Sequence, residues 1–233
     1  MFEIGPVFIG NKPGDQEIVL AGIKSGLASR LNWLEKERKL DVFASKRDVM
    51  QTLYEIGLDN NKFKIDTKTP TYYHPGKSGA IYQNSFDKVP IAFFGEIHPN
   101  ITHKIDIKTD ALIIFEIFLD RIKISDGKIR DQKSKYQYSD FQKSERDFAF
   151  VLDKSFEVQE LIKIISDVDK DLIKSIKVFD VYEGENIDKH KKSVALNITI
   201  QSTKKSLTEE DLNNLNKLII SSVENKTGAK LRS

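Results

Sequence analysis

Residues 193–201 read Ser-Val-Ala-Leu-Asn-Ile-Thr-Ile-Gln, and the organisation of the C-terminal half can be worked out from this stretch. Apolar side chains occupy every second position, at Val194, Leu196, Ile198 and Ile200. Because successive side chains of a β-strand point to opposite faces of its sheet, this alternation predicts a strand with one buried face and one open face.

The segments around this strand predict the rest of a small domain. Thr208 and Asp211 have the spacing of a helix capping box, and Gly228 is suited to end that helix. The expected elements are a strand at 148–152, a helix at 156–168, a strand at 176–182, the strand quoted above, a helix from Thr208 and a strand at 229–232. This β-α-β-β-α-β order is typical of the ferredoxin-like fold, whose two helices cover one face of a four-stranded antiparallel sheet.

The N-terminal half predicts a mixed α+β domain with a mostly antiparallel sheet. Strands are expected at 2–9 and 18–23, a helix at 45–56, and long apolar strands in the centre of the sheet at 89–97 and 111–119. The polar stretch 126–139 has little apolar periodicity and is expected to be a linker between the two halves.

Composition excludes several classes of site. The 233 residues include no cysteine, which rules out disulfides, thiolate metal sites and a cysteine nucleophile. A net charge of +2 means that any nucleic-acid-binding surface has to be local. No apolar run reaches the roughly 20 residues of a membrane span. The first residues have neither the basic nor the apolar region of a signal peptide. We therefore expect a cytoplasmic protein that does not contact a membrane.

No set of residues predicts a catalytic centre or a metal site. Glu96, His98 and His103 are the nearest approach to a metal-ligand set, and their spacing fits none of the usual zinc patterns. We expect His74 and His98, each close to a proline, to hydrogen-bond the backbone of turns instead. A phosphate-binding glycine loop and a serine nucleophile motif are both missing from the sequence.

Residues 146–151 resemble the RNP1 motif of RNA-recognition modules, whose aromatic residues stack on bases. Here, however, Asp147 replaces the motif's glycine, and the match falls on the first strand of the unit, where RNP1 belongs on the third. We therefore expect Phe148 and Phe150 to be core residues, with base stacking as the alternative.

The connection between the second and third strands of this unit predicts a binding site. Asp180 and Tyr182 are two residues apart and share a face, whereas Phe179 and Val181 are expected to point into the helices. Ser193 lies at the other end of the connection and faces the open side. A carboxylate, an aromatic ring and a hydroxyl suit one splayed nucleic-acid base. An ordinary surface loop is the alternative.

Several short motifs, taken together and in order, carry a likeness to a known family. They are Phe2-Glu3-Ile4-Gly5, Tyr73-His74-Pro75-Gly76-Lys77-Ser78, Phe94-Gly95-Glu96-Ile97-His98-Pro99, Arg146-Asp147-Phe148-Ala149, Phe179-Asp180-Val181-Tyr182-Glu183-Gly184 and Lys192-Ser193-Val194-Ala195. In these motifs the chain resembles the C-terminal part of the β subunit of bacterial phenylalanyl-tRNA synthetases, over essentially its whole length.

The resemblance implies a domain plan and a set of partners. Residues 1–125 would be the latter part of an inactive class II synthetase-like domain, 126–138 a linker, and 139–233 a ferredoxin-fold anticodon-binding domain. The partners would be tRNA(Phe) and the catalytic α subunit of an α2β2 enzyme. ATP and Mg²⁺ would act in the whole enzyme, with no cofactor in this chain. A whole β subunit is about three times longer, so the chain is expected to be a fragment or a split subunit.

The resemblance also implies roles for individual residues. In the family, the residues matching Asp180, Tyr182 and Ser193 contact the first anticodon base, a guanosine. Basic residues nearby are expected to bind tRNA phosphates: Arg146, Lys189, Lys191 and Lys192. Glu145 stands where the family has an arginine, so one phosphate contact is expected to be lost. Two other functions remain open, a free-standing ferredoxin-fold RNA-binding protein and a self-contained enzyme in the N-terminal half.

Overall fold

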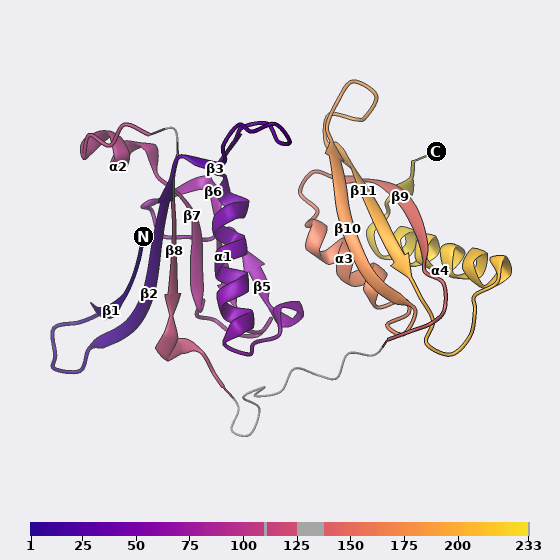
Figure 1. Cartoon of the computed structure of the whole chain (residues 1–233), viewed down its shortest axis with the longest axis horizontal. Coiled ribbons are helices and arrows are strands. Elements are labelled where there is room, and N and C mark those ends of the chain that lie inside the picture. The colour runs from indigo at the N-terminus through magenta and orange to yellow at the C-terminus, as the bar shows by residue number, and fades with distance from the viewer. Residues whose placement is uncertain (110, 125–137, 233) are drawn as a thin grey trace. The chain divides into compact units, whose positions relative to one another are not determined.

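The computed structural model describes residues 1–109, 111–124 and 138–232, which form two compact units (Figure 1). The division between the units falls at 133/134. It therefore lies outside the described residues, as does almost all of the expected linker at 126–138. Each unit has its own sheet and its own hydrophobic core.

The first unit is built on a six-stranded sheet in which every neighbouring pair of strands is antiparallel. Its order is β1-β2-β8-β7-β6-β5. The strands are β1 (Phe2–Phe8), β2 (Gln16–Ser25), β5 (Lys64–Asp66), β6 (Tyr73–Tyr82), β7 (Ala92–Ile97) and β8 (Leu112–Phe118). The central position expected for the two long apolar strands is confirmed, since they are β7 and β8.

Helix α1 (Val42–Glu55) lies across one face of this sheet (Figure 1). It begins three residues before the expected start because the Asp41 side chain accepts a hydrogen bond of 2.9 Å from the backbone N–H of Ala44. Val49 and Leu53 on this helix are fully buried against Ile81 and Ile117 of the sheet. That burial fixes the helix on the sheet.

Smaller elements complete the first unit. They are the short strands β3 (Leu27–Ser29) and β4 (Arg38–Lys39), the helix α2 (Pro99–Lys104), and the 3-10 turns η1 (Asn60–Lys62) and η2 (Leu119–Arg121). The sequence analysis did not predict strand β6, because Pro75 and Gly76 interrupt its apolar pattern. The structure accommodates both residues in an irregularity of the β6–β7 register between Tyr73 and Ser78.

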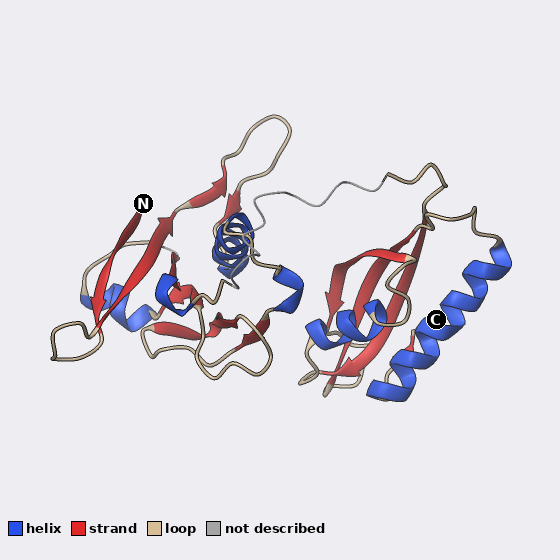
Figure 2. Ribbon diagram, turned by 90° about the horizontal axis from the view of Figure 1, so that it is seen from below, coloured by secondary structure: helices blue, strands red, loops and turns tan. Residues whose placement is uncertain are grey.

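The second unit has the predicted ferredoxin-like fold (Figure 2). Its four-stranded antiparallel sheet has the order β10-β11-β9-β12, which is the second, third, first and fourth strand of the unit. The elements are β9 (Ser144–Asp153), α3 (Val158–Ser166), β10 (Ile173–Tyr182), β11 (Lys191–Ile200), α4 (Glu209–Thr227) and β12 (Lys230–Leu231).

The expected caps of α4 are confirmed. The Thr208 side chain accepts a hydrogen bond from the backbone N–H of Asp211, and the Asp211 carboxylate accepts one from the backbone N–H of Thr208. These bonds and the ammonium group of Lys205 lower the pKa of the Asp211 carboxyl to about 2. Gly228 ends the helix with φ 68°, a left-handed conformation that glycine adopts without strain.

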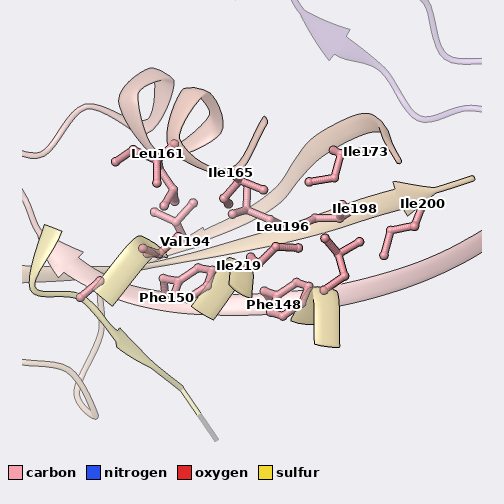
Figure 3. Close-up of a cluster of buried hydrophobic side chains, with 14 of the residues drawn as sticks. Phe148, Phe150, Leu161, Ile165, Ile173, Val194, Leu196, Ile198, Ile200 and Ile219 are labelled. Carbon is pink, nitrogen blue, oxygen red and sulfur yellow. The ribbon is translucent and has the colours of Figure 1, made fainter. Parts of the chain in front are cut away.

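One face of this sheet and both helices enclose the core (Figure 3). Phe148 and Phe150 on β9 are part of it, with their rings stacked at a centroid distance of 6.0 Å. Leu196 and Ile198 on β11 contribute to the same core, as does Ile219 on α4. The core assignment of the two phenylalanines is therefore confirmed, and the alternative of base stacking on this strand is wrong.

Adjacent residues on α4 provide a direct test of this packing. Ile219 is fully buried, whereas Leu218 is exposed. Ile219→Ala should lower the free energy of unfolding by about 2–5 kcal/mol, because it removes buried methyl groups and leaves a cavity. Leu218→Ala should change it by less than about 0.5 kcal/mol. Urea denaturation followed by circular dichroism measures both, and equal effects would contradict the assigned helix face.

Candidate nucleic-acid interface

The face of the second sheet that carries no helix is organised in rows, because residues directly opposite each other on neighbouring strands share a face. One row runs across the sheet as Tyr182, Ser193, Val151 and Lys230. The next row runs as Asp180, Ala195 and Ala149, and the backbone N–H of Arg232 donates to the carbonyl of Ala149 at 2.7 Å. The structure thus places Asp180, Tyr182 and Ser193 together on two adjacent rows.

A β-bulge in β10 puts Asp180 and Tyr182 on this face. Val178 lies opposite Leu196, a core residue, and so belongs to the side that carries the helices. Two residues later Asp180 lies opposite Ala195, which leaves Phe179 as an extra residue in the strand. Without the bulge, Asp180 and Tyr182 would continue the alternation of Val178 and point toward the helices.

The prediction that Phe179 and Val181 point into the helices is wrong for Phe179, whereas Val181 lies on the predicted side of the sheet. Phe179 is 60% exposed because the bulge leaves it without a partner on β11. Val181 lies opposite the buried Val194, on the side of the helices, yet it is also exposed. β10 is the edge strand of the sheet, so its end has no further strand beside it.

The ring of Tyr182 is held by two neighbours on different elements. A Cβ at Gly184 would lie 2.0 Å from the Tyr182 hydroxyl oxygen, so the ring occupies the space that only a glycine leaves free. The guanidinium carbon of Arg232 lies 5.5 Å from the ring centroid, within the range of a cation–π interaction. Tyr182 keeps 38% of its surface exposed.

The side chains of Asp180 and Ser193 differ in how far a ligand can reach them, because Asp180 is exposed and Ser193 is buried. Within the described parts of the chain, neither side chain makes a hydrogen bond or an ion pair. Ser193 is only 3% exposed, although it lies on the face without helices. A ligand that uses the Ser193 hydroxyl must therefore displace a side chain that covers it.

The four expected phosphate-binding residues are in different environments. Lys189 is exposed in the β10–β11 connection, and Lys191 begins β11 opposite Asp153 on the open face. The ammonium group of Lys192 donates to the backbone carbonyl of Lys154 at 2.9 Å. Lys191 and Lys189 therefore lie closest to the rows described above.

Arg146 is not brought together with the other site residues. It lies opposite Ile198, on the side of the sheet that faces the helices. Its guanidinium forms an ion pair of 3.5 Å with Glu209 at the start of α4 and donates to the backbone carbonyl of Glu145. These contacts give Arg146 a local structural role in this unit.

In the first unit, ionisable side chains meet at Glu116. Its carboxylate accepts hydrogen bonds from the hydroxyls of Tyr72 at 2.7 Å and Tyr73 at 3.0 Å. Burial, and after it the neighbouring carboxylate, raises the pKa of both phenols. Both tyrosines therefore stay protonated and act as hydrogen-bond donors, which is the behaviour of a structural cluster.

His74 and His98 hydrogen-bond the backbone of turns, as expected. The Nδ1 atom of His74 accepts from the backbone N–H of Gly76 at 3.0 Å, and that of His98 accepts from Asn100 at 3.2 Å. Glu96 is paired with Lys77 at 3.0 Å. Among residues 1–109, 111–124 and 138–232, no three histidine or acidic side chains gather in a way that could hold a metal ion.

No helix in these ranges has the length and apolar character to cross a membrane.

Comparison with known proteins first defines the class of the second unit. Residues 139–232 match the family model of the ferredoxin-fold anticodon binding domain. The unit with the open face is therefore an anticodon-binding module.

The comparison then identifies the family of the whole chain. Residues 1–119 match the model of the phenylalanyl tRNA synthetase beta chain CLM domain. The chain is 36% identical over 232 residues to the phenylalanine–tRNA ligase β subunit of Paramagnetospirillum magneticum, and 38% identical over 237 residues to that of Bartonella quintana. Each match covers 100% of this chain and 29% of the relative. The chain belongs to the phenylalanyl-tRNA synthetase β chain family, which confirms the resemblance found in the sequence.

Three features of the interface were missed by the sequence analysis. Nothing in the sequence predicts the bulge at Phe179, and Arg232 reaches Tyr182 only through the position of β12. The need for a small residue at 184 could have been suspected, because a glycine two residues after an aromatic strand end leaves room for the ring to fold back.

The contact between Gly184 and Tyr182 leads to a specific prediction. Gly184→Ala should displace the Tyr182 ring, because the added methyl would overlap it, while the fold stays intact because the ring is the end of a movable side chain. The ring resonances of Tyr182 in NMR spectra should shift, and the thermal midpoint should change little. Gly76→Ala is the control, since its added methyl would meet His74 at an ordinary 3.7 Å. An unchanged Tyr182 spectrum in Gly184→Ala would contradict the assigned ring position.

Proposed function

We propose that this chain is a non-catalytic part of a phenylalanine–tRNA ligase β subunit. In this role it recognises the anticodon of tRNA(Phe) through its second unit and packs on the catalytic α subunit through its first. The complete α2β2 enzyme would charge tRNA(Phe) with phenylalanine in the cytoplasm, with ATP and Mg²⁺ bound elsewhere in the assembly. The family of the chain supports this proposal over a free-standing RNA-binding protein, because both units match parts of the same subunit.

The observation that carries the anticodon proposal is the pair of adjacent rows on the open face. Tyr182 and Ser193 are direct neighbours across β10 and β11, and Asp180 lies in the next row on the same strand as Tyr182. An aromatic ring, a carboxylate and a hydroxyl are thus within reach of a single nucleotide. Single-stranded RNA is recognised by this combination of base stacking and hydrogen bonding to the base edge.

The chemistry of the three groups suits a guanosine at the first anticodon position. The imino and amino groups of guanine are two neighbouring donors, and an ionised Asp180 carboxylate offers two acceptor oxygens. Tyr182 would stack on the base, and the Ser193 hydroxyl would add a hydrogen bond. Lys189 and Lys191 would contact phosphates, whereas Lys192 and Arg146 already have contacts within the protein.

The exposed apolar side chains of the first unit support a protein partner. Phe2, Ile4 and Phe8 on edge strand β1 are exposed, and so are Trp33 and Leu34 between β3 and β4. Such side chains are enriched where two proteins meet. We assign this surface to contact with the α subunit.

The first unit is not expected to activate an amino acid. Class II synthetases clamp ATP phosphates with arginines, and the sequence carries none of the arginine-bearing class II motifs that do so. Arg121 is in addition paired with Glu17 at 2.6 Å and bonded to the carbonyl of Pro90. The purified chain should therefore show no phenylalanine-dependent pyrophosphate exchange. An intact α/β ligase from a relative is the positive control. Robust exchange by this chain alone would overturn the assignment of chemistry to the α subunit.

The anticodon proposal is tested with a stem-loop of tRNA(Phe) that carries guanosine or adenosine at the first anticodon position. Stacking on an aromatic side chain contributes about 1–3 kcal/mol per base, so Tyr182→Ala should weaken binding by roughly 5- to 150-fold. Asp180→Asn should mainly reduce the preference for guanosine, because an amide accepts with one oxygen only. Fluorescence anisotropy with the full chain measures both quantities.

The matched control for this experiment is Tyr138→Ala, which removes an exposed tyrosine that lies outside the sheet. It should leave affinity and base preference unchanged. If Tyr182→Ala and Asp180→Asn also leave both unchanged, the site is not on the open face. Lys191→Ala should act differently from both, by weakening the guanosine and adenosine stem-loops alike and reducing the dependence on salt.

A further inference from the structure

The side chains of Arg232 and Tyr182 approach each other from opposite edges of the second sheet. Arg232 follows β12 at one edge, and Tyr182 ends β10 at the opposite edge. Strands β9 and β11 lie between them. The guanidinium nevertheless comes within 5.5 Å of the Tyr182 ring centroid, so the side chain must lie along the open face.

Small residues make this crossing possible. The backbone N–H of Arg232 bonds to Ala149, which places Arg232 at the end of the row formed by Ala149, Ala195 and Asp180. The two alanines in the middle of the row leave a shallow track for a long side chain. Larger residues at these positions would lift the arginine away from the sheet.

The guanidinium of Arg232 lies beside the row that contains Ser193. In this row, Ser193 and Val151 lie between Tyr182 and Lys230. Ser193 is 3% exposed, so a base can reach its hydroxyl only if neighbouring side chains move. One side of the Tyr182 ring has a cation beside it, and this cation is the group that a stacking base would meet.

We propose that Arg232 closes the base-binding site in the free protein and contacts a phosphate of the RNA once a base has displaced it. This inference rests on the proposed function of Asp180, Tyr182 and Ser193. A base that stacks on Tyr182 and reaches Ser193 must take the space that the guanidinium occupies. The displaced side chain stays on the face where the RNA backbone lies.

The chemistry of arginine suits both positions. The planar guanidinium stacks on an aromatic ring and also binds phosphate through two parallel hydrogen bonds. Within the described residues, Arg232 makes no ion pair with Asp180 or any other carboxylate, so the contact with the ring is its side-chain interaction there. A side chain held in this way can be released by a competing base.

One ligand without phosphate and one with phosphates distinguish the two proposed roles of Arg232, which are to close the site and to bind a phosphate. Guanosine has no phosphate, so Arg232 can only compete with it for the space beside Tyr182. Arg232→Ala should therefore bind guanosine several-fold more tightly than the wild-type chain. The tRNA(Phe) anticodon stem-loop is relieved of the same competition but loses a phosphate contact, and we expect the lost contact to outweigh the gain, so the same variant should bind it about 5-fold more weakly. Its salt dependence should fall by about 0.7, the slope for one phosphate contact on a single strand. NMR titration of the full chain measures guanosine, and fluorescence anisotropy measures the stem-loop.

The controls make every result decisive. Lys217→Ala removes one exposed positive charge from α4 and should change neither affinity. Arg232→Lys should retain the salt dependence of stem-loop binding, but it should bind guanosine as tightly as Arg232→Ala does. The inference is overturned if Arg232→Ala weakens both ligands, strengthens both, or behaves like Lys217→Ala. If Tyr182→Ala binds the stem-loop as tightly as the wild-type chain, the proposed anticodon site itself is wrong. If Tyr182→Ala weakens stem-loop binding but Arg232→Ala changes neither affinity, the anticodon site stands and only the role of Arg232 is rejected.

Discussion

A single extra residue in β10 determines what the open face of the second unit displays. At Ile176 and Val178 the even-numbered side chains of the strand face the helices, and after the bulge at Phe179 they face the other way. Without the extra residue Asp180 would lie opposite Val194 on the side of the helices, as Val181 now does. The bulge therefore brings a carboxylate and an aromatic ring to the face that also carries Ser193.

The two faces of the second sheet carry different kinds of residues. The side with the helices is filled by aliphatic and phenylalanine side chains, and the basic residues on that side, Arg146 and Lys192, are held by contacts within the domain. The open side carries small, polar and charged residues in register. Stability therefore depends mainly on the face that carries the helices, and residues of the open face can change without loss of the core.

Most of the fold was predictable because it depends on local signals. The alternation in β11 and the capping box and glycine of α4 are readable from neighbouring residues, and each was correct. Strand β6 was missed because Pro75 and Gly76 break the apolar pattern, while the structure absorbs them in an irregular register. The site was predicted only in part. The grouping of Asp180, Tyr182 and Ser193 agrees with the structure, but the bulge and the reach of Arg232 depend on contacts between distant segments.

The strand that positions Arg232 is the weakest part of the sheet. β12 pairs with β9 at an edge through Lys230 and Leu231, with one more backbone hydrogen bond from Arg232 to Ala149, whereas β11 is paired along its length on both sides. Short edge strands open far more often than the domain unfolds as a whole. Amide hydrogens at the C-terminal edge should therefore exchange with solvent much sooner than those of β11. Warming would loosen the contact between Arg232 and Tyr182 well below the melting temperature, so the state of this surface is governed by local fraying as well as by what binds to it.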